Sequence, residues 1–289
     1  MIIAPEISLA ALIDRYDYFL VDQFGVLRDD VGAYDGAAAA LRALKDRGKH
    51  VIVLSNSGRT GDYNAERFVR LGFDRELFER FVTSGDVAFD ILSASSDIRP
   101  GMRAFTISSG GDQNLADRLG LTSVARSDEA DLVIISGSEA ERIELEVYRR
   151  QLAPAAANKA PCICTNPDIH KLADGKIVPG AGAIARIYKD LGGMVHWIGK
   201  PHREIYEFAI ARWNSADSAK IVCIGDSIEH DIKGATDMAL SSVLVRTGIL
   251  ADASEEELSE LTRHFAANPT YIMPGFSNGG SGRQRASAI

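Results

Sequence analysis

Short apolar segments alternate with amphipathic segments along most of this chain of 289 residues. The apolar runs 18–22 and 50–54 are predicted strands, and the segments 36–47 and 61–71 are predicted helices, the first with Asp35 as N-cap. The same alternation returns later, at 194–198, 203–213, 220–224, 231–239 and 242–245. Strands and helices in alternation are typical of a doubly wound parallel sheet, so we expect an α/β fold with a Rossmann-like core.

The middle of the chain repeats this pattern and forms a second predicted unit. Its strands are expected near 103–107, 131–135 and 161–165, and its helices near 86–94, 112–119 and 139–152. We therefore predict a core of residues 1–83 and 191–276, interrupted by an inserted α/β cap domain of residues 84–190. The Gly- and Ser-rich segment 277–289 is expected to be a flexible tail.

Two of the predicted core strands end at an aspartate. Asp22 ends the first, with Gly25 three residues later, and Asp226 follows the strand 220–224, with Asp231 five residues later. Ligands of open parallel sheets bind at the carboxyl ends of the strands. Carboxylates are ligands of Mg²⁺, and a carboxylate can attack phosphorus. The pattern predicts a Mg²⁺ and phosphate site with Asp22 as nucleophile; the alternative is that these aspartates only cap turns and helices.

Two further segments follow predicted core strands. The turn after 50–54 contains Ser55, Asn56, Ser57 and Arg59, whose hydroxyl and N–H groups can hold phosphate oxygens. Lys200 follows the strand 194–198 and can neutralise a phosphoryl group. Both segments have a plainer interpretation, because Ser and Asn are common turn residues and Arg59 and Lys200 are of types that are usually solvated.

Composition excludes some classes of protein. The net charge is −8 and no strongly basic run occurs, so we expect no nucleic-acid partner. The start lacks a signal-peptide pattern and no apolar run approaches membrane-spanning length, so we expect a cytoplasmic protein without membrane contact. The cysteines Cys162, Cys164 and Cys223 give no disulfide framework. The first two alternate as strand residues do, which favours burial over a metal site.

The four segments, in this order and with 26 residues between Lys200 and Asp226, resemble the haloacid dehalogenase superfamily of phosphohydrolases. The strings 164–168 and 178–185 are similar to the cap end of its subfamily IIA, which includes sugar-phosphate and nitrophenyl-phosphate phosphatases. The resemblance implies Mg²⁺ as cofactor, a small phosphorylated metabolite as substrate, and a homodimer as one option. It also implies roles for single residues: Asp22, the backbone carbonyl of Phe24 and Asp226 as metal ligands, Ser55 and Lys200 as catalytic residues on the phosphate, Asp231 in catalytic support, and Asn56, Ser57, Arg59, Asn166 and Asp168 near the substrate.

One position departs from the family. Its first motif is Asp-x-Asp, whose second aspartate protonates the leaving group, and this chain has Phe24 there. The loss of a general acid lowers a rate by roughly 10²–10⁴, and Asp29 or Asp30 are candidates to replace it. We expect a Mg²⁺-dependent phosphatase, with sugar phosphates as one substrate class and an aspartyl-phosphate intermediate. The alternative is a phosphate-binding or regulatory protein on the same scaffold; C–P bond hydrolysis, which needs a cap lysine such as Lys159, Lys171 or Lys176, is a third possibility.

Overall fold

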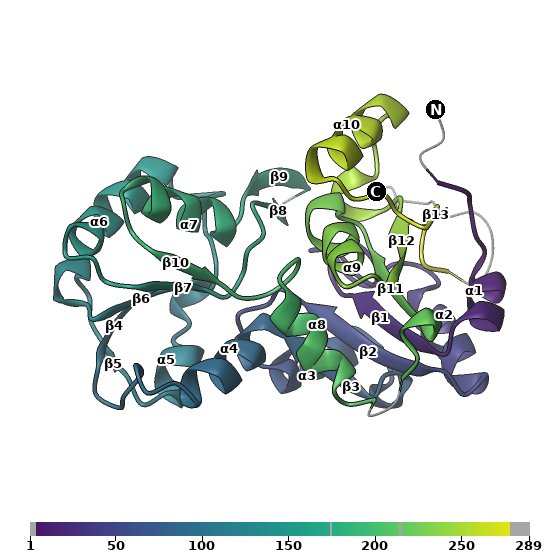
Figure 1. Ribbon diagram of the computed structural model, residues 1–289, viewed down its shortest axis with the longest axis horizontal. Helices are drawn as coiled ribbons and strands as arrows, with labels where there is room; N and C mark the ends of the chain where they lie inside the picture. Colours follow the sequence, from purple (N-terminus) through teal and green to yellow (C-terminus); the bar gives the residue numbers. More distant parts are fainter. Residues whose placement is uncertain (1–3, 174, 214–215, 278–289) are drawn as a thin grey trace. The chain divides into compact units, whose positions relative to one another are not determined.

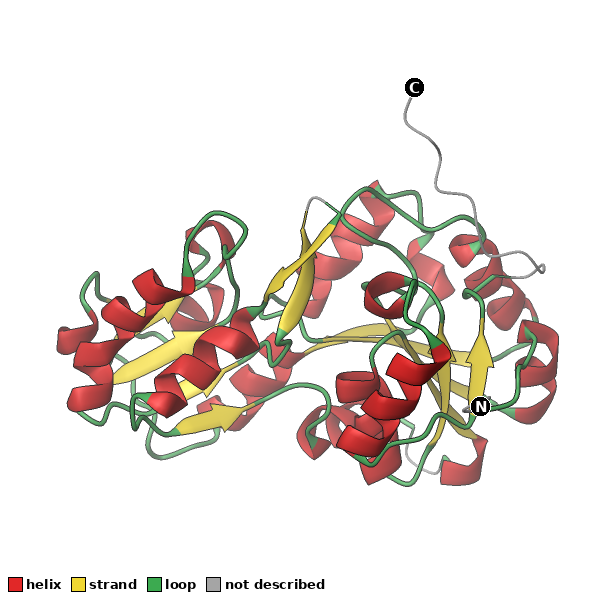
Figure 2. Ribbon diagram, turned by 90° about the horizontal axis from the view of Figure 1, so that it is seen from above, coloured by secondary structure: helices red, strands yellow, loops and turns green. Residues whose placement is uncertain are grey.

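The computed structural model describes residues 4–173, 175–213 and 216–277. The chain divides into two compact units, one of residues 1–54, 65–81 and 209–289, the other of residues 55–64 and 82–208. In each unit a parallel sheet lies between helices (Figure 2), so the predicted α/β class is confirmed. The predicted domain limits at 83/84 and 190/191 stay a prediction, although residue contacts group 55–64 and 191–208 with the second unit. The predicted tail lies, beyond Ser277, outside the described residues.

A six-stranded sheet is the centre of the first unit, in the order β13-β12-β11-β1-β2-β3. Its central strands β1 and β11 are buried at nearly every position, as strands covered on both faces are. The order reverses between β1 and β11, the place where open parallel sheets bind ligands. The strands are β1 (Tyr18–Asp22), β2 (His50–Ser55), β3 (Arg80–Thr83), β11 (Ile221–Gly225), β12 (Ser241–Val245) and β13 (Tyr271–Met273).

The α-helices of this first unit, within the described residues, are α1 (Leu9–Arg15), α2 (Ala37–Asp46), α9 (Lys233–Asp237) and α10 (Glu255–Phe265). Helices α3 (Gly61–Arg70) and α8 (Arg203–Ile210) begin in the second unit and end in the first. Helix α2 buries Ala37, Leu41 and Leu44, which recur every three to four residues on one face. Its N-cap is Gly36 in the left-handed conformation and not Asp35, so that prediction is wrong: Gly36 turns the chain into the helix without a side-chain cap. The helix expected over 231–239 begins earlier, as a π-helical turn over Ile228–Ile232 that continues into α9.

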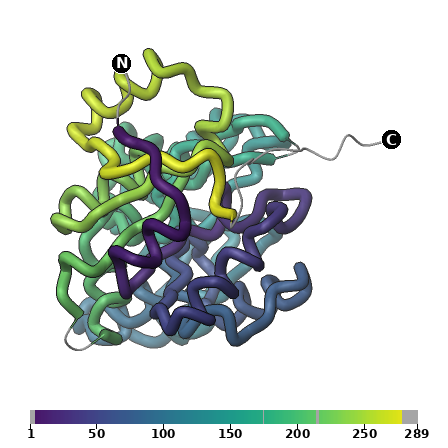
Figure 3. Tube along the Cα trace, turned by 90° about the vertical axis from the view of Figure 1, so that its right-hand side faces the viewer, coloured from purple at the N-terminus to yellow at the C-terminus, as the bar shows by residue number. Residues whose placement is uncertain are grey.

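The two ends of the described chain lie side by side. Figure 3 shows the N-terminal segment running beside the segment of β13. Ile7 N–H donates to Ile272 O, and Ile272 N–H donates to Pro5 O, both at 3.0 Å. The N-terminal segment therefore covers the edge of β13, which would otherwise present unpaired backbone groups.

The second unit contains a five-stranded parallel sheet in the order β10-β7-β6-β4-β5. Helices α6 and α7 lie along one face of this sheet (Figure 1), where Tyr148, Leu152, Ile184 and Tyr188 are buried. The strands are β4 (Arg103–Ile107), β5 (Thr122–Ser123), β6 (Leu132–Ile135), β7 (Cys162–Cys164) and β10 (Val195–Trp197). A hairpin of β8 (His170–Ala173) and β9 (Lys176–Pro179) follows β7, and the helices are α4 (Ser84–Ser93), α5 (Asn114–Arg118), α6 (Leu145–Ala157) and α7 (Ala181–Asp190).

Strand β10 corrects one prediction. The strand expected at 194–198 forms, but it pairs with β7 in the five-stranded sheet, with Val195 opposite Cys162, and not in the core sheet. An apolar run predicts a strand without saying which sheet it joins. The cysteines of β7 are buried, and burial raises the pKa of the Cys162 thiol and brings that of Cys164 to about 12. This favours the buried-core interpretation, because metals bind thiolates.

Among the described residues, each helix is too short or too polar to cross a bilayer.

Candidate active site

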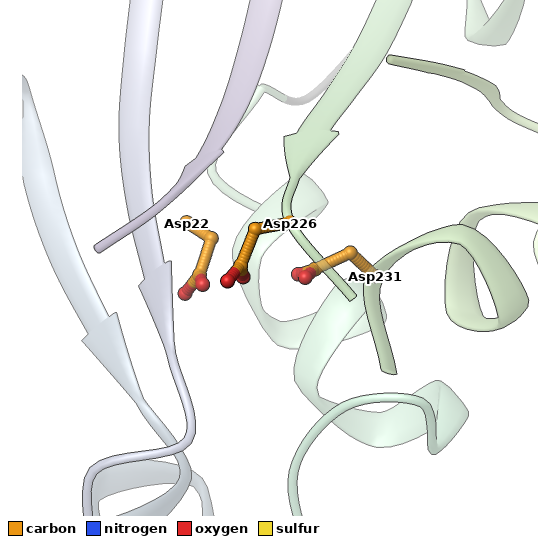
Figure 4. A group of neighbouring side chains, drawn as sticks. All are labelled: Asp22, Asp226 and Asp231. Carbon is orange, nitrogen blue, oxygen red and sulfur yellow. The ribbon is translucent and has the colours of Figure 1, made fainter. Parts of the chain in front are cut away.

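Three aspartates of the first unit converge at the point where the strand order reverses. One carboxylate oxygen from each of Asp22, Asp226 and Asp231 lies within 4.8 Å of the others. Figure 4 shows the side chains pointing toward one another from the end of β1, the residue after β11, and the following helical turn. The register explains this approach: Val21 is opposite Ile224, so Asp22 and Asp226 leave neighbouring strands within one residue of the same level.

Three glycines make room for these carboxylates. A Cβ on Gly25 would lie 2.0 Å from Asp226 Oδ2, and one on Gly248 would lie 1.8 Å from the same atom. A Cβ on Gly225 would lie 2.0 Å from Asp231 Cγ. Gly25 also has a φ of +88°, which side chains other than glycine rarely adopt. Glycine is therefore required at position 25 for two reasons: the backbone has a positive φ, and a side chain there would clash with the Asp226 carboxylate.

Backbone N–H groups orient two of the three carboxylates. Ile249 N–H donates to Asp226 Oδ2 at 2.9 Å, and Ser227 N–H donates to Asp231 Oδ2 at 3.1 Å. The hydroxyl of Thr247 donates to Gly25 O, which ties the loop after β12 to the turn after β1. These hydrogen bonds connect the loops that follow β1, β11 and β12, and so fix the positions of the carboxylates at this edge of the sheet.

This donor set suits a divalent metal ion. Three carboxylates so close together repel one another unless a cation lies between them. Mg²⁺ prefers oxygen ligands and commonly binds protein carboxylates together with water and substrate oxygens. Sequence reasoning placed Asp22 and Asp226 among the ligands but gave Asp231 only a supporting role. Asp231 joins the cluster because the π-helical turn, which carries no sequence signal that we recognised, returns it toward Gly225.

The predicted phosphate turn and lysine lie in the second unit, where Asn56 connects them. Lys200 N–H donates to Asn56 Oδ1 at 2.6 Å, and Asn56 Nδ2 donates to Lys200 O at 3.0 Å and to Asp168 Oδ1 at 2.7 Å. Asn56 and Lys200 are buried, with 5% and 3% of their surface exposed. The amide of Asn56 therefore positions Lys200 and Asp168. Its predicted contact with substrate stays a prediction.

The rest of this turn is packed tightly against neighbouring backbone. Ser57 O accepts from Ser84 Oγ at 2.9 Å and from Gly85 N–H at 3.0 Å, and Ser57 Oγ accepts from Asn64 Nδ2 at 3.0 Å. A Cβ on Gly58 would lie 2.7 Å from Ser136 Cβ. Ser57 thus holds the turn in place, and Ser55, the last residue of β2, is buried at its start with Oγ accepting from Ser57 N–H at 3.3 Å.

The remaining predicted site residues have structural partners. Arg59 Nε lies 3.3 Å from Asp112 Oδ2, and its guanidinium stacks on the Tyr63 ring at 4.5 Å. Arg59 thus joins the turn to the loop after β4, while 33% of its side chain stays exposed. Asn166 Oδ1 accepts from Asp168 N–H at 3.2 Å, a side-chain turn that shapes the cap-end string. Contact of these residues with substrate stays a prediction.

The two candidates for a replacement acid have different surroundings. Asp29 Oδ1 accepts from the N–H groups of Val31 and Gly32 at 2.9 and 3.0 Å, so its carboxylate stabilises the turn. Asp30 is exposed. Neither residue belongs to the carboxylate cluster.

Comparison with known proteins agrees with this geometry. A sequence model described as haloacid dehalogenase-like hydrolase matches residues 19–122, and a second, HAD-hydrolase-like model matches residues 197–278. The crystal structure of a haloacid dehalogenase-like hydrolase from Brucella suis 1330 is 30% identical, with a TM-score of 0.81, over 94% of this chain and 99% of that one. The chain belongs to the haloacid dehalogenase-like hydrolase family. The predicted superfamily, with its IIA relatives, and the predicted fold are thereby confirmed.

Two other relatives of this hydrolase have named activities. Acid sugar phosphatase of Staphylococcus aureus is 27% identical over 241 residues, which are 81% of this chain and 88% of that protein. The crystal structure of glycerol phosphate phosphatase from Mycobacterium tuberculosis, in complex with magnesium, is 24% identical over 92% of this chain and 78% of that one. Its TM-score of 0.68 shows a shared fold.

Proposed function

We propose that this hydrolase is a Mg²⁺-dependent phosphatase of small phosphorylated metabolites, with sugar phosphates as a candidate class, and that it works through an aspartyl-phosphate on Asp22. The observation that carries the proposal is the cluster of Asp22, Asp226 and Asp231 at the reversal of the strand order. The activities named for its relatives, on sugar and glycerol phosphates, support a phosphomonoester substrate.

In this mechanism an Asp22 oxygen forms a bond to phosphorus while the bond from phosphorus to the ester oxygen breaks, and the leaving alkoxide takes a proton from solvent or from another residue to become the alcohol. Water then hydrolyses the aspartyl-phosphate and returns Asp22 and inorganic phosphate. A bound Mg²⁺ would supply positive charge to the phosphoryl oxygens, with Asp22, Asp226 and Asp231 as the carboxylates that fit it. Ser55 is proposed to donate a hydrogen bond to the phosphate, and Lys200 to stabilise the charge that develops on it.

Phe24 determines which leaving groups the enzyme handles well. A phenyl ring donates no proton, so an alkoxide must leave with help from solvent or from another residue. General acid help contributes roughly 10²–10⁴ in rate, or about 3–5 kcal/mol of barrier. Aryl or acyl phosphates, whose leaving groups need no proton, should therefore react faster than sugar phosphates.

The second candidate is a protein that binds a phosphorylated ligand without turnover, and Phe24 is the observation that favours it. It predicts metal-dependent binding with no release of phosphate.

The test is hydrolysis of nitrophenyl phosphate and a panel of sugar phosphates, with and without Mg²⁺, by wild type, Asp22→Asn and Phe24→Asp. Turnover that requires Mg²⁺ and disappears in Asp22→Asn supports the phosphatase. Asp97→Asn is the matched control, because Asp97 is an exposed aspartate outside the cluster. A wild type that binds phosphate esters but releases no phosphate supports the second candidate, and an Asp22→Asn variant as active as wild type excludes the proposed mechanism.

A further inference from the structure

The turn that follows Asp22 carries a cation next to Phe24. Phe24 and Arg28 are bridge partners, and Gly25 N–H donates to Arg28 O at 2.8 Å. The guanidinium carbon of Arg28 lies 5.4 Å from the centre of the Phe24 ring, within the range of a cation–π contact. The side chain at position 24 thus packs against a positive charge from its own turn.

Arg28 is buried, and it forms no ion pair with any residue that the structure describes. Only 6% of its surface is exposed. Its Nε and Nη2 donate to Asp29 O, at 2.8 and 2.5 Å, and among the residues that the structure describes no carboxylate lies within ion-pair distance. A guanidinium has five N–H donors, so three have no protein acceptor within this described part of the chain. Burial and the charge of Arg67 lower the Arg28 pKa, while Asp29 and Asp30 oppose that shift.

Such an arrangement is unfavourable in the protein alone. Moving a charge out of water is costly unless an anion compensates it. The nearest acidic side chain in sequence does not, because the Asp29 carboxylate accepts from the Val31 and Gly32 N–H groups. A cation–π contact with Phe24 recovers only part of this cost. The turn is thus suited to an anion that arrives from outside.

We propose that Arg28 binds a second anionic group of the substrate, so that the preferred substrates are phosphomonoesters whose leaving group itself carries a carboxylate or a phosphate. This rests on the proposed phosphatase function. The same short turn carries both groups: Asp22 begins it, Gly25 packs against Asp226, and Arg28 ends it. A guanidinium donates two parallel hydrogen bonds to a carboxylate or phosphate, which selects such a group by charge and by shape.

The test compares two esters that differ only in this respect: glycerol 3-phosphate, and 3-phosphoglycerate, in which a carboxylate replaces the hydroxymethyl group. The measured quantity is the ratio of kcat/KM for the two, in wild type, Arg28→Met and Arg28→Lys. We expect wild type to prefer 3-phosphoglycerate, and Arg28→Met to lower the ratio roughly tenfold or more, the usual effect of removing a hydrogen bond to a charged group. Arg28→Lys keeps the positive charge but cannot donate two parallel hydrogen bonds, so it should lower the ratio less. Arg47→Met is the control and should leave the ratio unchanged, because Arg47 is an exposed arginine at the C-terminal end of α2.

A ratio that is the same in wild type and both Arg28 variants overturns the proposal. If Arg28→Met does not fold, the kcat/KM ratio of Arg28→Lys alone tests the proposal. Hydrolysis of nitrophenyl phosphate, measured in the same experiment, separates the proposed phosphatase function from the proposed role of Arg28. If wild type hydrolyses none of the three esters, the phosphatase proposal fails. Calorimetric binding of glycerol 3-phosphate and 3-phosphoglycerate to wild type and Arg28→Lys then tests Arg28: tighter binding of 3-phosphoglycerate that weakens in the variant supports its role, and equal binding refutes it.

Discussion

Replacement of Gly225 by alanine is a direct test of the geometry of the carboxylate cluster. The new Cβ would lie 2.0 Å from Asp231 Cγ and 2.4 Å from Asp231 Oδ2. Carbon atoms in contact lie about 3.5–4.0 Å apart, so the Asp231 carboxylate has to withdraw by roughly 1.5 Å. Gly225 does not have a positive φ, so the substitution adds a clash without adding backbone strain.

A displacement of this size removes Asp231 from the cluster. Metal–ligand distances tolerate about 0.2 Å, and loss of the residues that shape a metal site typically lowers affinity roughly 10–100-fold. We expect Gly225→Ala to weaken Mg²⁺ binding by about that factor, and to lower the free energy of unfolding by about 1–3 kcal/mol, as overpacking does. Calorimetric titration with Mg²⁺ and urea unfolding in the presence of a chelator measure the two effects separately.

Gly48→Ala is the matched control. Gly48 has a φ of +66°, and no atom of the described residues lies within 4 Å of its ideal Cβ, so alanine there costs stability through the backbone alone. It should destabilise the protein by about 1 kcal/mol and leave Mg²⁺ affinity unchanged. The reasoning is refuted if Gly225→Ala binds Mg²⁺ as tightly as wild type, or if Gly48→Ala weakens binding equally.

Two further predictions concern the second unit. Asn56→Ala removes the amide that holds the Lys200 backbone on both sides, so kcat/KM for nitrophenyl phosphate should fall roughly tenfold or more; unchanged kinetics would contradict the positioning role. Burial raises the pKa of Cys162 and brings that of Cys164 to about 12, so at pH 8 both remain thiols. Neither should be alkylated by iodoacetamide until urea unfolds the protein; rapid alkylation in the folded state, detected by mass spectrometry of peptides, would show that the strand is not buried.

The strands that carry the carboxylates could be predicted because their signals are local. A buried parallel strand is apolar at nearly every position; β1 ends at Asp22, and β11 ends one residue before Asp226. Helix α10 also has a local signal, because Ser254 and Glu257 form a capping box that the sequence shows. Strand β13 has only three residues and depends on pairing with distant segments, so a local pattern could not identify it.

The partners of the predicted site residues could not be inferred, because they are distant in sequence. Asn56 contacts Lys200 and Asp168, which are 144 and 112 residues away. Arg59 pairs with Asp112 through the packing of one loop on another. Asn and Arg in a turn have many possible partners, and only the fold selects one. The sequence predicted a strand before Lys200, but not that this strand joins the five-stranded sheet.

Position 24 illustrates why a missing side chain does not by itself decide activity. The sequence shows only that a carboxylate is absent, and general acid catalysis is therefore reduced by an amount that depends on the leaving group. The structure adds that Phe24 lies against a buried guanidinium. An aspartate placed at 24 would meet that cation, and an opposite charge at close range lowers a carboxyl pKa. A carboxylate that stays ionised donates no proton, so Phe24→Asp should restore acid catalysis only when Arg28 is replaced as well. The two residues therefore have to be considered as a pair.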